Sequence, residues 1–245
     1  LAAQQDAIRA QVEQTTMRTD LVMIEAERRR AAARLNALVA RPASAPLAPP
    51  ERIRPLPPPA RLQVADLEER ARAKSPLIAA EEARARSAGK MVELTDLERY
   101  PDLSVGISPI QMGNRIAEWE IMFEVNIPLQ QDRRRAKERE ARGMLEAARA
   151  KRDAAATSTL GELSESVAGL EAARSTETLV ESSLLPQAEL TFQSALAGYE
   201  NGQVDFATLL DAQRQILRAK VERLKAQAEA QMRLAEIERI VGEDL

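Results

Sequence analysis

The chain has 245 residues; 30% are charged, only 2% are aromatic, and the formal net charge is −3. This composition is typical of long helices or coiled coils, because a compact core of this size normally uses more large aromatic side chains. The absence of Cys and His excludes disulfides, thiol nucleophiles, histidine metal sites and Ser-His-Asp triads. Interspersed acidic and basic residues disfavour nucleic-acid binding. We therefore expect no enzyme and no cofactor.

The beginning of the sequence does not look like a natural start. It opens with the polar, helix-like Leu1-Ala2-Ala3-Gln4, with no initiator Met and no signal peptide. No apolar run of about 18 residues follows, so no transmembrane helix is expected. Apolar residues at helical spacing predict one helix over residues 1–41, which Pro42 ends.

A proline-rich connector is predicted over residues 42–62, because proline fixes φ and lacks a backbone donor. Two interpretations stay open: an interdomain linker, or a strap along the outside of a helical bundle. Short helices are predicted over residues 63–99. Ser75 as N-cap and Pro76 at the first helical position mark the start of the second one.

The apolar period changes from 3.6 to 2 within residues 100–129, which predicts a β-hairpin with a turn at Gln111–Asn114. The second strand is long enough to cross a bilayer when tilted. Two interpretations remain: a hairpin packed on its own helices, or part of a shared membrane barrel. In a barrel, the lipid-facing residues would be Trp119, Ile121, Phe123, Val125 and Ile127, and the lumen-facing residues would be Glu118, Glu120 and Glu124.

A very long helix is predicted over residues 130–198, spanning on the order of 100 Å, with Pro186 bending it or marking a local irregularity. A glycine-containing turn follows at 199–205. A returning helix occupies most of 206–245, with Gly242 as its C-cap. The predicted fold class is thus mainly α, with long antiparallel coiled-coil-like helices and one β-hairpin.

A weak internal repeat appears when the chain is shifted against itself by about 202 residues. In this alignment residues 1–41 correspond to the returning helix and form the last helix of a first repeat. The matched residues are Ala10-Gln11 with Ala212-Gln213, Leu35 with Ile237, Leu38 with Ile240, and Val39 with Val241.

Taken together, the segments resemble the TolC-like outer-membrane efflux factor family along essentially the whole chain, corresponding to the C-terminal three-fifths of a typical member. The heavy-metal efflux branch is the most similar, through Asp6, 9–13 and 25–30. The family-like motifs are Arg34-Leu35-Asn36-Ala37-Leu38-Val39 with Pro42, Tyr100-Pro101-Asp102-Leu103-Ser104-Val105-Gly106, Val125-Asn126-Ile127-Pro128-Leu129, and Gly198-Tyr199 through Gly202 and Asp205 to Leu209-Leu210-Asp211-Ala212-Gln213.

The resemblance implies a homotrimer in the outer membrane of a Gram-negative bacterium, extending into the periplasm. Each full protomer would give four strands to a 12-stranded barrel, two of them from this hairpin, above a helical tunnel with an equatorial connector. The function would be passive export in a tripartite efflux pump, with metal cations as one candidate cargo. Partners would be a periplasmic adaptor and, through it, an inner-membrane pump. The alternative is a periplasmic coiled-coil adaptor or structural scaffold.

The resemblance also assigns the turn as the periplasmic tip, where the pore narrows and the adaptor docks. Its tip or gate residues would be Gly198, Tyr199, Gly202 and Asp205, and its adaptor-docking residues would be Leu209, Leu210 and Asp211. Val204 stands where the best-known member has a locking arginine, so an ion-pair lock is not expected.

Simpler roles remain open for several of these residues. Tyr199 would either hydrogen-bond a neighbouring chain or cap its own helix, and Asp205 would be either a gate residue or an N-cap. Leu209 and Leu210 would pack in the helix seam as well as meet the adaptor. The three glutamates would either favour cations or simply face water.

Overall fold

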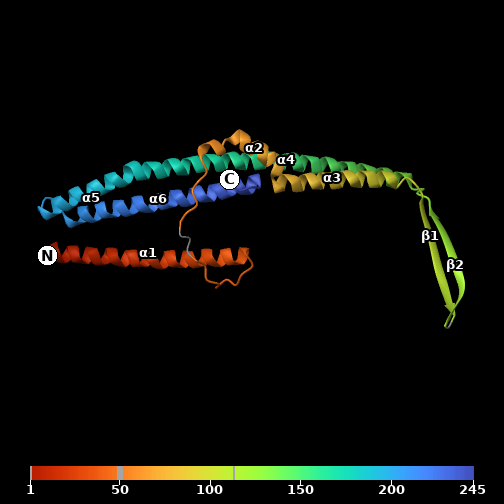
Figure 1. The fold of residues 1–245 in the computed structure, drawn as a ribbon, viewed down its shortest axis with the longest axis horizontal. Coiled ribbons are helices and arrows are strands. Elements are labelled where there is room, and N and C mark those ends of the chain that lie inside the picture. Colours follow the sequence, from red (N-terminus) through yellow and green to blue (C-terminus); the bar gives the residue numbers. More distant parts are fainter. Residues whose placement is uncertain (1, 49–51, 113) are drawn as a thin grey trace. The chain divides into compact units, whose positions relative to one another are not determined.

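The computed structural model describes residues 2–48, 52–112 and 114–245 (Figure 1). Leu1, residues 49–51 of the predicted connector, and Gly113 of the predicted hairpin turn lie outside these ranges. The described residues are mainly helical with one antiparallel hairpin, which confirms the predicted fold class. The elements are α1 (Ala2–Leu38), the 3-10 helix η1 (Pro59–Arg61), α2 (Val64–Lys74), α3 (Pro76–Leu97), β1 (Asp102–Met112), β2 (Arg115–Asn126), α4 (Gln131–Leu179), the π-helical turn η2 (Val180–Leu184), α5 (Leu185–Glu200) and α6 (Phe206–Val241).

The chain divides into two compact units. The first comprises Leu1–Leu56 and Ala172–Gln231, and the second comprises Pro57–Glu171 and Met232–Leu245. In the first unit, α5 and α6 run side by side (Figure 1), and both have buried alanines spaced seven residues apart: Ala188 and Ala195 on α5, and Ala212, Ala219 and Ala226 on α6. A seven-residue spacing keeps one face of a helix toward its partner, and the small side chains allow close approach of the two helices.

Helix α1 is linked to α6 by Arg214. The Arg214 Nε donates to both carboxylate oxygens of Glu13 at 3.1 Å, and its Nη1 donates to Asp211 Oδ1 at 3.0 Å. The hydrogen bond to Arg214 holds the pKa of Glu13 below its ordinary value. Most large apolar side chains of α1 nevertheless stay exposed, including Leu21, Val22 and Ile24. This helix therefore has apolar surface that its own chain does not cover.

The second unit has a core of larger aliphatic residues. Leu163, Val167 and Leu170 of α4 and Leu234 and Ile237 of α6 are buried. Figure 1 shows α3 running beside α4. Near the middle of this pair, a Cβ added at Gly89 would lie 4.0 Å from Leu145 Cδ1, which is ordinary van der Waals contact.

The end of α6 is fastened to the junction between α2 and α3. Gly242 has φ +79°, and a Cβ at this position would lie 2.9 Å from the carbonyl oxygen of Lys74. Glu243 forms ion pairs with Lys74 and with Arg70, the latter at 3.4 Å. Lys74, as hydrogen-bond donor, is the main reason that the pKa of Glu243 is lowered. The predicted C-cap at Gly242 thus has a tertiary role.

One predicted helix end and the extended conformation expected for the whole connector were wrong. Helix α1 ends at Leu38 rather than at residue 41, because Ala40 takes φ 55° and closes the helix. There the Arg41 N–H donates to the Asn36 carbonyl at 2.8 Å and the Ala40 N–H to the Ala37 carbonyl at 3.2 Å. The connector is not entirely extended either, since η1 forms at Pro59–Arg61.

Ser75 occupies the predicted N-cap position of α3, but its side chain makes no capping hydrogen bond. The same residue ends α2, where its N–H donates to the Ala71 carbonyl at 2.9 Å. Its side chain is buried and Oγ has no partner among the described residues. The turn between α2 and α3 therefore aims the hydroxyl into the core rather than at the first turn of α3.

The irregularity expected near Pro186 is a π-helical turn, Val180–Leu184. Proline cannot donate a backbone hydrogen bond, and a π turn absorbs the resulting change in the ladder. Before this turn, buried residues follow a heptad-like spacing through Leu163, Leu170 and Ala173 to Val180. After the π turn, the buried residues are Ala188 and Ala195. The seven-residue spacing continued from Val180 would give positions 187 and 194, so the buried positions are shifted by one residue.

Candidate functional site

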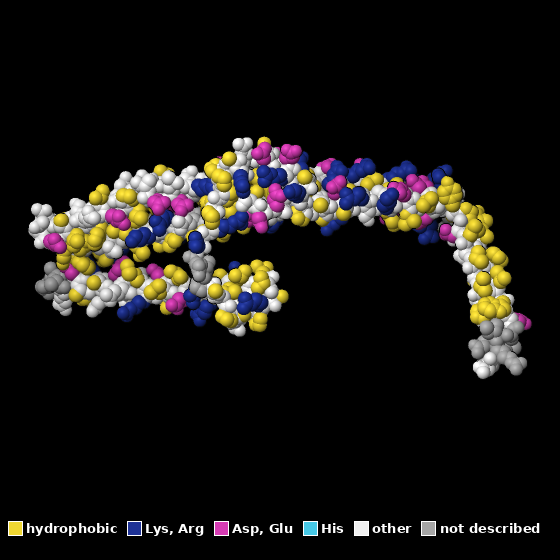
Figure 2. Space-filling view, viewed as in Figure 1, with side chains coloured by type: hydrophobic (Ala, Val, Ile, Leu, Met, Phe, Trp, Pro, Cys, Tyr) yellow, Lys and Arg dark blue, Asp and Glu magenta, His cyan; other side chains and the backbone are white. Residues whose placement is uncertain are grey.

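The β-hairpin has one apolar face and one polar face. Its antiparallel register pairs Leu103 with Val125, Val105 with Phe123, Ile107 with Ile121, and Pro109 with Trp119. Because paired residues point to the same side of a sheet, these residues form one surface, which we call the apolar face. Phe123 is 76% exposed and Trp119 64%, and Figure 2 shows hydrophobic side chains along this segment.

The opposite side of the hairpin carries the three predicted glutamates. Glu124 pairs with Ser104, Glu120 with Ser108, and Glu118 with Ile110. Met122 lies on this side across from Gly106, where an added Cβ would meet Met122 Cε at 3.4 Å. The structure thus separates the predicted lipid-facing and lumen-facing residues. Ile127 is the exception: β2 ends at Asn126, so Ile127 lies beyond the strand, just before Pro128.

The interpretation that the hairpin packs on its own helices is wrong for the described residues. The large side chains of the apolar face remain more than half exposed. Contiguous apolar surface of this kind marks a site for a membrane or another protein. A two-stranded ribbon is also marginally stable alone in water, so this hairpin needs a partner beyond the chain.

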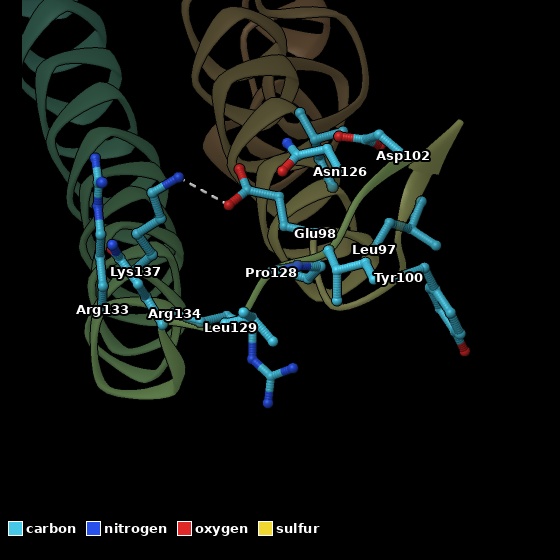
Figure 3. Close-up of a pocket in the computed structure, with 13 residues that line it drawn as sticks. Leu97, Glu98, Tyr100, Asp102, Asn126, Pro128, Leu129, Arg133, Arg134 and Lys137 are labelled. Atoms are coloured by element: carbon cyan, nitrogen blue, oxygen red, sulfur yellow. Dashed lines mark hydrogen bonds and ion pairs between the residues drawn. The ribbon is translucent and has the colours of Figure 1, made fainter. Parts of the chain in front are cut away.

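A groove lies where the hairpin joins the helices. It has a volume of about 770 Å³. Figure 3 shows Leu97, Tyr100, Pro128 and Leu129 near the hairpin base, and Arg133, Arg134 and Lys137 on α4. Lys137 Nζ is 2.8 Å from Glu98 Oε2, which ties α4 to the end of α3.

The predicted tip is a tight turn between α5 and α6, and it is shorter than expected. Gly198 and Tyr199 lie in the last turn of α5, which continues to Glu200. The Gln203 N–H donates to the Gly198 carbonyl at 2.8 Å and the Gly202 N–H to the Tyr199 carbonyl at 3.0 Å. With Gly202 at φ 69°, this is a Schellman motif, which satisfies the last carbonyls of the helix. The turn itself therefore covers only 201–205.

Asp205 begins α6 as its N-cap. Its Oδ1 accepts from the Thr208 N–H at 2.9 Å and from the Thr208 hydroxyl at 2.7 Å. These two bonds, the hydroxyl one first, hold the pKa of Asp205 below its ordinary value. The gate role proposed for Asp205 gains no contact within the described residues.

Apolar contacts close the tip. The Tyr199 and Phe206 rings meet edge-on with centroids 6.0 Å apart. A Cβ added at Gly198 would lie 3.2 Å from Val204 Cγ2, so glycine makes room for Val204. Within the described chain, Tyr199 thus makes its contact through its ring, against Phe206, and not through a capping hydrogen bond from its hydroxyl.

The residues predicted for adaptor docking follow on the first turns of α6. Leu209 and Leu210 are half-buried, while Asp211 is exposed and pairs with Arg214. The leucines therefore contribute to packing within the chain and still present part of their surface. Arg214, which binds Asp211, also binds Glu13.

Comparison with known proteins decides the family. The model of the outer membrane efflux protein family matches residues 67–243, which is more than half of the chain. The chain belongs to this family. A search among curated proteins gives no significant match. Membership of this family places the chain in the outer membrane, as the resemblance predicted.

Solved structures with the same fold include three outer-membrane proteins. VceC from Vibrio cholerae has a TM-score of 0.78 and 19% identity, over 98% of this chain and 58% of VceC. The channel OprN has a TM-score of 0.78 and 21% identity, over 97% of this chain and 55% of OprN. The open-state MtrE channel of Neisseria gonorrhoeae has a TM-score of 0.72 and 18% identity, over 94% of this chain and 53% of MtrE. Identities this low establish the fold alone, and the efflux protein spans a little over half the length of these three structures.

Two absences hold for the described part of the efflux protein. None of its helices is both long and apolar enough to cross a membrane. No group of three or more His, Cys, Asp or Glu side chains is placed to hold a metal ion.

Several contacts of the chain were not predicted from its sequence. Phe206, the ring partner of Tyr199, follows Asp205 directly. Its place at the start of a helix, next to the turn, was a signal that could have predicted a contact with Tyr199. Arg214 was also missed. Its pairing with Asp211 has the spacing of neighbours on one helix face, but Glu13 is 201 positions away, and no local pattern predicts such a pair.

Proposed function

We propose that this chain is part of a passive outer-membrane duct in a tripartite efflux system. The observation that carries the proposal is the two-faced hairpin, with a continuous exposed apolar face backed by glutamates. In a bilayer every backbone group must be paired, so a hairpin can cross it only as part of a closed barrel. Lipid would then cover Trp119, Ile121, Phe123 and Val125.

The barrel would be shared among three copies. With two strands here and two more in the rest of each protomer, a homotrimer closes at 12 strands. The uncovered apolar residues of α1, such as Leu21 and Ile24, support this proposal because neighbouring helices would bury them. The positive φ at Ala40 and at Gly242, 202 positions apart, supports the assignment of residues 1–41 as the last helix of a first repeat.

The tip of α5 and α6 would face the inner membrane. Its backbone is satisfied internally, so recognition by a periplasmic adaptor would use side chains such as Tyr199, Leu209 and Leu210. The inner-membrane pump would be reached through that adaptor. The connector at 42–62 would contribute to an equatorial region, together with the short helices of 63–99.

Metal cations are the proposed cargo class. Glu118, Glu120 and Glu124 lie on one face of β2, and three copies would line the lumen with carboxylates that favour cations. Reversal potentials in a salt gradient test this. The double variant Glu120→Gln, Glu124→Gln should lose cation preference, and unchanged selectivity would remove the cargo proposal without affecting the duct.

The duct itself is tested by planar-bilayer recording and by sedimentation in detergent. We expect stable conductance steps and a trimer mass. A monomer that leaves bilayers non-conducting would overturn the proposed function. Conductance without any response to an added adaptor would overturn only the partner assignment.

A further inference from the structure

The groove at the base of the hairpin combines an apolar wall with a basic one. Its apolar wall is formed by Leu97 at the end of α3 and by Ile127, Pro128 and Leu129 after β2, and Leu129 is 81% exposed. Arg133, Arg134 and Lys137 line it from the first turns of α4. A volume of about 770 Å³ falls in the range of small-molecule sites. An amphiphile with an anionic head is the chemistry that such a groove fits.

We propose that this groove binds the headgroup phosphate of an anionic phospholipid from the periplasm-facing leaflet. The inference rests on the proposed function, which places the hairpin in lipid and the helices in the periplasm. The groove lies where these two regions meet. The lipid's acyl chains would continue along the apolar face, beginning at Leu103 and Val125, the apolar pair next to the base of the hairpin.

Of the three cations that line the groove, Arg133 and Arg134 form no ion pair with a described carboxylate of the lining itself. Lys137 is engaged by Glu98 at 2.8 Å. Arg134 Nε is 3.4 Å from Glu138 Oε1, yet this buried nitrogen has no hydrogen-bond acceptor among the described residues. Arg133 has no ion pair within the described chain. Asp102 is the second acidic residue of the lining, so cations outnumber carboxylates by three to two.

The neighbouring Arg99 and Tyr100 extend this arrangement. The Arg99 guanidinium carbon lies 4.8 Å from the centre of the Tyr100 ring, and its Nη2 donates to the Tyr100 hydroxyl at 2.8 Å. Tyrosines gather at membrane–water interfaces, and arginines there extend their charged ends to the headgroups. A tyrosine that is 54% exposed at the end of an apolar face therefore marks the depth at which headgroups would lie.

Native mass spectrometry of the detergent-purified protein tests the proposal. Dioleoyl-phosphatidylglycerol is titrated, with dioleoyl-phosphatidylcholine and millimolar inorganic phosphate as separate arms. The test variant is Arg133→Gln with Arg134→Gln. Its matched control is Arg135→Gln with Arg139→Gln, which removes the same charge from the same helix at residues outside the groove. The variant Arg133→Lys with Arg134→Lys keeps the charge, and far-UV circular dichroism checks the helices of all three.

We expect the wild type to prefer phosphatidylglycerol, and the test variant to bind it roughly 30-fold more weakly, from about fivefold for each arginine near anionic lipid. The control and the lysine variant should stay within about threefold. Equal losses in test and control would reduce the effect to diffuse charge and overturn the site.

Three other results would also overturn it. They are no preference over phosphatidylcholine, displacement of the lipid by inorganic phosphate, and failure of the protein to enter bilayers. Only the last would remove the proposed function as well, because a conducting trimer without lipid preference leaves the duct intact.

Discussion

Replacing Ile121 by arginine should weaken insertion of the hairpin into a bilayer far more than replacing Met122. Ile121 lies on the apolar face opposite Ile107 and is 60% exposed, so the change empties no core. An arginine facing lipid costs about 2–4 kcal/mol near the bilayer midplane, equivalent to a shift of roughly 30- to 900-fold in the insertion equilibrium. Met122 points to the other side, across from Gly106, and its side chain is 55% exposed.

Urea titration of folding into phosphatidylcholine vesicles measures this difference. The single tryptophan of the chain, Trp119, lies on the apolar face and reports insertion by a blue shift of its emission. Ile121→Arg should lower the urea midpoint strongly, while Met122→Arg should stay near wild type. Equal midpoints for the two variants, with helix content unchanged, would show that lipid does not cover the apolar face.

Three further outcomes are expected of the helix ends. Gly202→Ala should destabilise by about 1 kcal/mol for its left-handed backbone, and Gly242→Ala by more, because only there does the added Cβ meet a carbonyl oxygen at 2.9 Å; equal thermal melts would contradict this. Ala40→Gly should stabilise by about 1 kcal/mol, since Ala40 has φ 55°, and a lowered melting point would refute it. The bonds from Thr208 hold the pKa of Asp205 below its usual 3.8, so their contribution is complete above that value and is lost as the pH falls through the lowered pKa; Asp205→Asn should flatten this acid dependence in denaturant titrations, and an unchanged slope would contradict it.

Periodicity and local end signals were sufficient to predict the hairpin and the long helices of this chain. Alternation over β2 placed Trp119 and Glu120 on opposite faces, because side-chain direction in a strand has a fixed period of two. The final helix was predicted to begin at residue 206 and to end near 241, as Phe206–Val241 does, since Asp205 and Gly242 are strong end signals. These features are local, and local sequence determines them.

Tertiary contacts were not predictable in the same way. The pair formed by Glu13 and Arg214 depends on how separate helices lie together, and many exposed charges of either helix would have served. Ala40 in a left-handed conformation runs against the intrinsic preference of alanine. Ser75 has a capping residue's identity, but the approach of α2 to α3 turned its hydroxyl inward.

The π-helical turn at Val180–Leu184 constrains how the length of this long helix can change. Each residue rotates a helix by about 100°, so the turn acts as a one-residue phase correction between the side that holds Val180 and the side that holds Ala188 and Ala195. An insertion or deletion on either side of the turn would rotate the buried residues beyond it away from the helices they pack against, unless its length were a multiple of seven residues. Family members whose long helix differs in length should therefore differ here by multiples of seven residues, or by one residue together with loss of the π-helical turn.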